Sequence, residues 1–178
     1  MSTIPMRSAV RPAPGDFGPY FQPYIDLVPD GDIVRALETQ SGTLLSTFSE
    51  FGGERGGYAY AEAKWTAAEV IGHVVDIERV FAYRAMCFLR GMGDVEQAGV
   101  DQDVMEPASR ATERGVDSWI REFKHLRASH VALFDPLNDE DLALVGRASG
   151  VSCTVRALLY KMFGHANHHA RVLEERYR

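Results

Sequence analysis

The sequence predicts an all-α protein, a four-helix bundle with an extended, proline-rich N-terminal arm. Two observations carry this prediction. Apolar residues recur at helical spacing in four long segments, and glycine-rich or acidic connections separate those segments. No stretch of any length alternates apolar and polar residues as a half-buried strand would. Four amphipathic helices of this kind bury their apolar faces most simply against one another, around a shared core.

Length and composition indicate one soluble domain. The 178 residues are 46% hydrophobic and 25% charged, which is ordinary for a globular chain. The net charge of −6 argues against a broad nucleic-acid-binding face. Cys87 and Cys153 lie in apolar surroundings, so we expect buried thiols rather than a disulfide. The N-terminus lacks an apolar signal segment and nothing approaches a membrane span, so we expect a cytoplasmic protein with no membrane partner.

Residues 1–29 form the predicted arm, and residues 30–178 form the bundle domain. The arm carries six of the eight prolines, which are Pro5, Pro12, Pro14, Pro19, Pro23 and Pro29. Proline fixes φ and removes a backbone donor, so this segment should be extended and not helical. Its second half contains the aromatic residues Phe17, Tyr20, Phe21 and Tyr24. They favour an arm that packs against its own domain, with an arm that braces a dimer as the alternative.

Capping residues mark where the first two long helices begin. Asp32 can cap a helix that runs to about residue 51. Two glycine pairs then break the chain. Thr66 and Glu69 form a capping box, in which each side chain bonds the other's backbone N–H. A second helix should therefore follow over residues 67–90, where a glycine stops it.

The second half of the chain should contain two more long helices. Residues 91–111 hold three glycines, a proline and several acidic residues, among them Asp94, Glu96, Asp101 and Asp103, and are predicted to form a long loop of the kind that is often functional. A third helix is expected over residues 112–134 and a short turn over 140–144. Residues 146–152 should be an irregular connection. Thr154 then opens the last helix, which reaches about Tyr177.

Three of the six histidines fall within five residues of that last helix. Successive helical residues turn by about 100°, so His165 and His169 share one face, with side chains about 6 Å apart. This spacing suits two imidazoles that converge on one metal ion. His168 points about 100° away from His169. We therefore set His168 aside as a flanking residue, with replacement of a neighbouring ligand as the alternative.

His73, on the second helix, is the predicted third ligand. A histidine on a largely apolar helix face is either hydrogen-bonded in the core or binds something. Metal sites in bundles are built from side chains that project inward from facing helices. Three histidines with an open position are typical of catalytic rather than structural zinc. The residues alone do not choose among zinc, nickel, iron and copper, and we expect a divalent zinc or nickel ion.

The remaining histidines and the nearby carboxylates are weaker candidates for a ligand or a catalytic residue. His130 shares an apolar helix face and is a minor ligand candidate, whereas His125 should be solvated. Asp76 and Glu69 lie within a turn of His73. Either could orient its ring or act as a general base, and the alternative is an ordinary surface or capping carboxylate.

Several segments resemble signatures of the DinB/YfiT-like superfamily. Residues 65–81, with Arg84, resemble its second-helix signature, and residues 164–177 resemble its last-helix signature. Asp101-Gln102-Asp103 and residues 122–127 resemble the DinB-like branch. The order and spacing of these segments match across the whole predicted bundle, and the arm is the part that the resemblance covers least.

The resemblance implies an up-down-down-up four-helix bundle, usually dimeric, so we expect a homodimer. The metal triad of the superfamily maps onto His73, His165 and His169. Its characterised enzymes include metal-dependent hydrolases and transferases that attach low-molecular-weight thiols to their substrates. In those enzymes the metal binds and activates water or the thiol.

A metal-dependent enzyme that acts on a small molecule is therefore the first hypothesis, as a hydrolase or a thiol S-transferase. The candidate bases are Asp76, Asp101 and Asp103. The cations that could hold the carboxylates of a thiol cofactor are Arg79, Arg84 and Arg171. The alternatives are a non-catalytic metal-binding protein of stress response or interaction, and a structural bundle whose histidines bind no metal.

Overall fold

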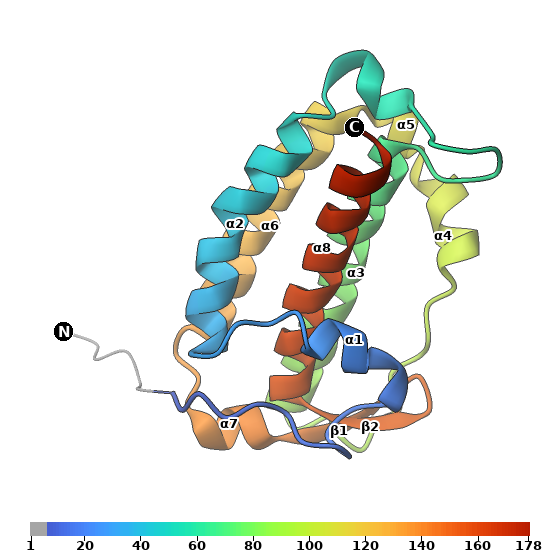
Figure 1. The fold of residues 1–178 in the computed structure, drawn as a ribbon. Helices are drawn as coiled ribbons and strands as arrows, with labels where there is room; N and C mark the ends of the chain where they lie inside the picture. Colours follow the sequence, from blue (N-terminus) through green and yellow to red (C-terminus); the bar gives the residue numbers. More distant parts are fainter. Residues whose placement is uncertain (1–6) are drawn as a thin grey trace.

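The computed structural model describes residues 7–178, and its centre is a bundle of four long helices (Figure 1). These are α2 (Ile33–Ser49), α3 (Ala67–Leu89), α6 (Val116–Phe134) and α8 (Val155–Arg176). α3 packs against α6 and α8, and α2 packs against the same two helices. The predicted helical bundle is confirmed. Among the described residues, no helix is both long and apolar enough to cross a membrane.

The expected capping residues set the helix starts. The Asp32 carboxylate accepts from the backbone N–H of Val34 at the start of α2. In the capping box of α3, the Thr66 N–H donates to Glu69 Oε2 at 2.6 Å and the Glu69 N–H donates to Thr66 Oγ1 at 3.2 Å. Thr154 caps α8 by accepting from the N–H of Ala157. Local chemistry therefore decides where three of the four long helices begin.

A buried polar layer separates two apolar clusters along the bundle. The Arg127 guanidinium on α6 donates to both carboxylate oxygens of Glu78 on α3, at 2.7 and 2.6 Å. Its Nη1 donates to the carbonyl of Leu37 and to Oε1 of Gln40, both on α2. Gln40 Nε2 in turn donates to the carbonyl of Phe163 on α8. One network thus joins all four long helices.

Three predicted connections differ from the structure. Residues 91–111 contain α4 (Gln102–Ser109) and the start of α5 (Ala111–Arg114). α6 begins at Val116 instead of Thr112, because Gly115, with φ +73°, interrupts the helical run. The predicted irregular connection is an antiparallel hairpin of β1 (Val145–Ala148) and β2 (Val151–Thr154). Its two turn residues have positive φ, as a tight hairpin turn requires. The predicted short turn is α7 (Asp139–Ala143).

The prediction that the arm contains no helix is wrong for its second half. Residues 19–25 form a 3₁₀ turn, η1 (Pro19–Phe21), and a helical turn, α1 (Gln22–Ile25). Pro19 and Pro23 occupy the first turn of these elements. A missing backbone N–H removes no hydrogen bond there, so proline is compatible with the helical start. Pro5 lies outside the described residues. The same holds for residues 1–6 as a whole, on which the expectation of no signal segment partly rests.

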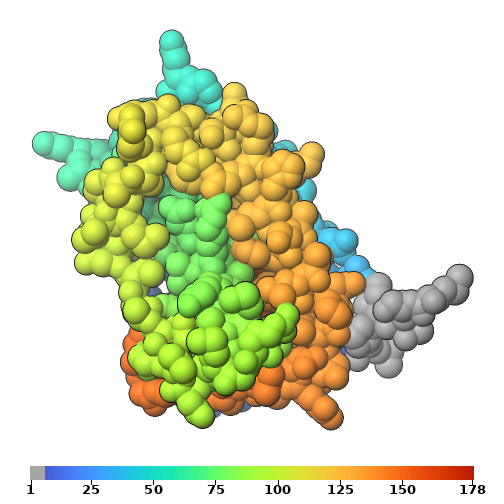
Figure 2. All heavy atoms as spheres, turned by 180° about the vertical axis from the view of Figure 1, so that it is seen from behind, coloured from blue at the N-terminus to red at the C-terminus, as the bar shows by residue number. Residues whose placement is uncertain are grey.

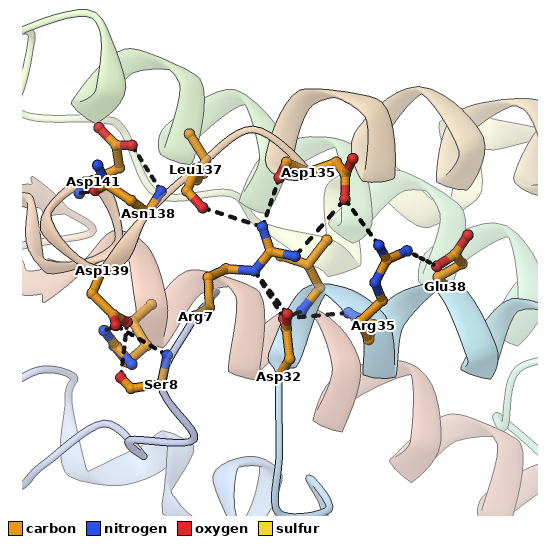
Figure 3. A network of polar contacts seen from close by, with 12 residues as sticks. Arg7, Ser8, Asp32, Arg35, Glu38, Asp135, Leu137, Asn138, Asp139 and Asp141 are labelled. Carbon is orange, nitrogen blue, oxygen red and sulfur yellow. Dashed lines mark hydrogen bonds and ion pairs between the residues drawn. The ribbon is translucent and has the colours of Figure 1, made fainter. Parts of the chain in front are cut away.

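The arm is fastened to the bundle at several points. Arg7 Nε donates to the carboxylate of Asp32, and its Nη1 donates to the carbonyls of Asp135 and Leu137 (Figure 3). Arg11 Nη2 donates to the carbonyl of Ile25 at 2.6 Å. α1 itself lies across α8 (Figure 1). On the opposite face, α4 in yellow flanks an uncovered stretch of α3 in green (Figure 2). Cys87 and Cys153 are buried free thiols, as predicted.

The first prediction concerns the buried ion pair. We expect Glu78→Gln to lower the free energy of unfolding by about 3–5 kcal/mol, because it leaves Arg127 buried without its counter-charge. Urea denaturation followed by circular dichroism measures this. Burial alone would raise the pKa of Glu78, but Arg127 and His130 outweigh burial and hold that pKa below 4.5. The pair should therefore stabilise the wild type fully above pH 4.5 and progressively less as the pH falls further.

Glu122→Gln is the matched control, because Glu122 pairs with Arg79 and Arg114 while its side chain is 27% exposed. Its effect should stay within about 1 kcal/mol. Equal losses from Glu78→Gln and Glu122→Gln would contradict the special role of the buried pair.

The second prediction concerns the contact between the arm and α8. A Cβ at Gly164 would lie 1.9 Å from the carbonyl oxygen of Tyr24, so Gly164→Ala should push α1 off α8. We expect a lower melting temperature and faster proteolysis within residues 17–30. Gly42→Ala on α2, where a Cβ meets nothing within 4 Å, should instead stabilise the protein by about 0.5–1 kcal/mol. Unchanged proteolysis in Gly164→Ala would show that the arm does not depend on this contact.

Candidate metal centre

His73, His165 and His169 come together between α3 and α8. Nε2 of His73 lies 3.0 Å from Nε2 of His165. One potential ligand atom from each of the three residues lies within 4.8 Å of the others. The three ring centroids are 4.5 to 4.9 Å apart. The helical spacing of His165 and His169 and the approach of the two helices produce this cluster.

Glycines next to two of these histidines allow close packing. A Cβ at Gly72 would lie 3.0 Å from the Trp119 ring on α6, so α3 could not pack as closely there with a larger residue. Gly164 gives the arm its contact with α8 at the level of the site. Both glycines therefore help to hold the histidine-bearing segments in place.

The three imidazoles are neutral at physiological pH. Burial lowers the pKa of His73 to about 4. Burial, followed by the neighbouring His73 and His168, lowers the pKa of His169 to about 3. His165 is buried, and its pKa is also held well below 6.5. Three neutral imidazoles with nitrogens this close fit the donor set of a divalent transition metal, because ligand nitrogens must be unprotonated to coordinate.

A cavity of about 350 Å³ opens onto the three histidines. Its lining comes from α3, from α8, from the second half of the arm, from the start of α4 and from the β1–β2 turn. Its lining includes Tyr20, Tyr24, Trp65, Phe81, Arg84 and Ser149. A volume of this size matches pockets that hold small molecules.

The predicted catalytic carboxylates lie around the cavity and not on its lining. Asp76 is half-buried one turn from His73, and they line a small adjoining pocket. Burial raises the pKa of Asp76 although Arg79 Nη1 bonds its Oδ1 at 3.1 Å. Asp103 is exposed and shares a neighbouring cavity with His169. Asp101 instead caps α4 by accepting from the N–H of Asp103.

Of the three cations that the sequence suggested for a thiol cofactor, Arg84 is the one that lines the main cavity. Arg171 is exposed and is not part of that lining. Arg79 bonds Asp76 and Glu122 on the surface of α3 and α6.

The other candidates from the sequence lie outside the three-histidine group. The ring centroids of His168 and His169 are 5.1 Å apart, but His168 is not one of the three residues whose ligand atoms cluster. His130 is buried against Glu78, with Nδ1 3.2 Å from the carboxylate, which accounts for its place on an apolar helix face. His125 is exposed. Glu69 is held in the capping box of α3.

Four residues at the site were missed by sequence reasoning. The Tyr24 ring packs edge-on against His165, with centroids 5.6 Å apart, and Trp65 lies 4.9 Å from His73. Tyr20 joins Tyr24 on the arm wall, and Gln102 lines the main cavity from α4. The aromatic run of the arm was the available signal for the two tyrosines. Nothing in the local sequence around Gln102, which stands between Asp101 and Asp103, indicated that its side chain would line a cavity.

Comparison with known proteins identifies the family. Residues 36–173 match the model of the DinB superfamily, which is more than half of the chain. The chain belongs to the DinB superfamily. The solved structure of YfiT from Bacillus subtilis matches this DinB-superfamily chain with a TM-score of 0.70 at 16% identity, covering 80% of this chain and 82% of that one. At this identity the likeness shows a shared four-helix fold. No curated protein gives a significant match.

YfiT itself is described as a probable metal-dependent hydrolase with an unusual four-helix bundle topology. The resemblance found in the sequence is thereby confirmed at the level of family and fold. The arm before residue 36 lies outside the matched family segment.

The third prediction tests the ligand set of this DinB-superfamily protein. After incubation with zinc and desalting, the wild type should retain about one equivalent of metal, measured by inductively coupled plasma mass spectrometry. Alanine at His73, His165 or His169 should each weaken zinc affinity at least about tenfold, because each removes one of three ligands. His168→Ala is the matched control and should retain the metal. Loss of metal in His168→Ala but not in His169→Ala would overturn the assignment.

Proposed function

We propose that this protein is a metal-dependent enzyme that hydrolyses a small-molecule substrate, with His73, His165 and His169 as ligands of a zinc or nickel ion. The observation that supports this most is that three neutral imidazoles converge on the wall of a cavity of about 350 Å³. When bound, such an ion acts as a Lewis acid and lowers the pKa of a water or thiol at its open position. Burial of the three histidines keeps them unprotonated for this role.

Asp76 is the proposed proton acceptor and Asp103 the second choice. Burial raises the pKa of Asp76, which brings it nearer to the working pH of a general base. Its Oδ1 accepts from Arg79, so Oδ2 remains to take a proton or to orient the ring of His73. Asp103 is exposed at the rim beside His169, where it would exchange protons with solvent.

Thiol transfer is the second candidate function. A low-molecular-weight thiol with carboxylates needs a cation near the site, and Arg84 lines the same cavity as the three histidines. Arg171, the other cation proposed for such a cofactor, would have to act from the exposed surface of α8. A non-catalytic metal-binding protein of stress response or interaction is the alternative to both reactions.

Further features belong to the same proposal. We propose a cytoplasmic homodimer with no nucleic-acid partner, in which residues 30–178 form one up-down-down-up domain. The net charge of −6 and the match to the DinB superfamily support these features.

The fourth prediction tests turnover. Zinc-loaded and nickel-loaded protein should hydrolyse members of a panel of esters, amides and lactones, and chelator treatment should abolish this activity. Asp76→Asn should lower kcat/KM by about 10²–10⁴-fold, as loss of a general base does, with metal content unchanged. Asp103→Asn is the matched control and should change the rate less.

The same panel with added thiols and electrophiles tests the second candidate through adduct formation detected by mass spectrometry. Tight metal binding without any hydrolysis product or thiol adduct would contradict both reactions and favour the non-catalytic alternative. Hydrolysis that survives metal removal would contradict the role of the metal centre.

A further inference from the structure

Two buried cations in the described part of the chain lack a carboxylate partner. Arg84 is 6% exposed and Lys161 is 4% exposed, yet neither forms an ion pair with any residue in 7–178. The other buried arginines, which are Arg7, Arg127 and Arg156, each pair with an aspartate or glutamate. Buried charges are normally paired, so these two cations point to an anion supplied from outside.

Arg84 belongs to the lining of the main cavity, and Lys161 lies behind that lining. Both hydrogen bonds of Arg84, to the Ala98 carbonyl and Ser149 Oγ, leave from Nη2. Its Nε and Nη1 groups therefore remain for a ligand. Lys161 lies one turn before His165 on α8, and its Nζ is 4.2 Å from the centroid of the Phe21 ring.

Phe21 also lines the cavity, so Lys161 sits directly behind the cavity wall. Lys161 Nζ is 5.9 Å from the centroid of Phe81, another lining residue. An anion between Arg84 and Lys161 would supply both with the counter-charge that residues 7–178 do not provide.

The part of the cavity between Arg84 and the histidines is lined by apolar and aromatic groups. The arm contributes Tyr20, Phe21 and Tyr24 to this lining, and α3 contributes Ile77 and Phe81. Flat rings stack favourably between such surfaces. The arm lies outside the residues matched by the family model, so this wall is a feature that the family match does not account for.

We infer that the cavity binds an aryl carboxylate, with the carboxylate between Arg84 and Lys161 and the ring between the arm and α3. The scissile ester or amide bond then lies at the three histidines, and this reaction rests on the proposed function. Water oxygen bonds to the acyl carbon and the acyl C–O or C–N bond breaks. One water proton goes to the leaving group, and the other is released to solvent as the new carboxylic acid ionises. Arg84 lies about 16 Å further along α3 than His73, at the helical rise per residue, so the ligand must be elongated.

Calorimetric titration of the full chain with three probes tests this binding mode. The probes are 3-phenylpropanoate, its amide 3-phenylpropanamide and the saturated analogue 3-cyclohexylpropanoate. We expect the amide to bind at least about tenfold more weakly because it lacks the charge. The cyclohexyl acid should bind about three- to tenfold more weakly because its ring cannot stack. Zinc-loaded and chelator-treated protein are compared, so that carboxylate ligation of the metal is recognised.

Variants locate the binding site. Lys161→Met and Arg84→Gln should each weaken 3-phenylpropanoate binding about tenfold or more, and Arg147→Gln, an exposed hairpin cation, should not. Lys161→Met should also keep or raise the melting temperature of the free protein, because it removes a buried unpaired charge. Tyr20→Ala should weaken binding, whereas Tyr58→Ala, an exposed tyrosine outside the cavity, should leave it unchanged.

The aryl carboxylate site and the proposed hydrolase function can each be overturned while the other stands. Equal binding of the acid and the amide, no binding of either, or equal losses from Lys161→Met and Arg147→Gln would overturn the aryl carboxylate site, even if the metal-loaded protein hydrolyses uncharged esters. Probe binding to chelator-treated protein that follows the expected pattern would support the site. If no metal-dependent hydrolysis is then found, only the proposed function is overturned.

Discussion

The buried pair of Arg127 and Glu78 is the constraint on which the bundle depends. Arg127 also bonds α2, and Gln40 of α2 bonds α8. The network therefore fixes the positions of all four long helices relative to one another along the bundle axis. Glu78 lies between one and two turns from His73 on α3. Gln40 also donates to Asn167, between the two ligand histidines of α8. A network that fixes α3 against α8 in this way also fixes His73 opposite His165 and His169.

The site combines a part made by the bundle with a part made by the arm. The bundle supplies the three imidazoles, which burial keeps neutral, and Arg84 further along the cavity. The arm supplies an aromatic wall and reaches α8 only because Gly164 has no side chain. The three histidines thus lie within the segment that the DinB superfamily model matches, whereas the arm wall lies before that segment.

Local patterns in the sequence predicted the four long helices, the caps of three of them, and the pair His165 and His169. Helical periodicity and capping chemistry act within a few residues, so they can be read without the fold. His73 was predicted as a partner because bundles place ligands on facing helices, which is a fold-level argument.

What the sequence did not predict depends on contacts distant in the chain. The arm was expected to be extended, but Pro19 and Pro23 start helical turns that pack on α8. The hairpin strands are four residues long, too short for alternation to reveal. The pairing of Glu78 with Arg127, and the lack of a carboxylate partner for Arg84 and Lys161 within residues 7–178, both depend on tertiary contacts.

The most direct test of the metal centre is X-ray absorption spectroscopy at the zinc edge of the loaded protein. The account predicts three imidazole nitrogens at about 2.0–2.1 Å, together with one further light-atom ligand. A sulfur ligand at about 2.3 Å, or fewer than three imidazoles in the first coordination shell, would contradict it.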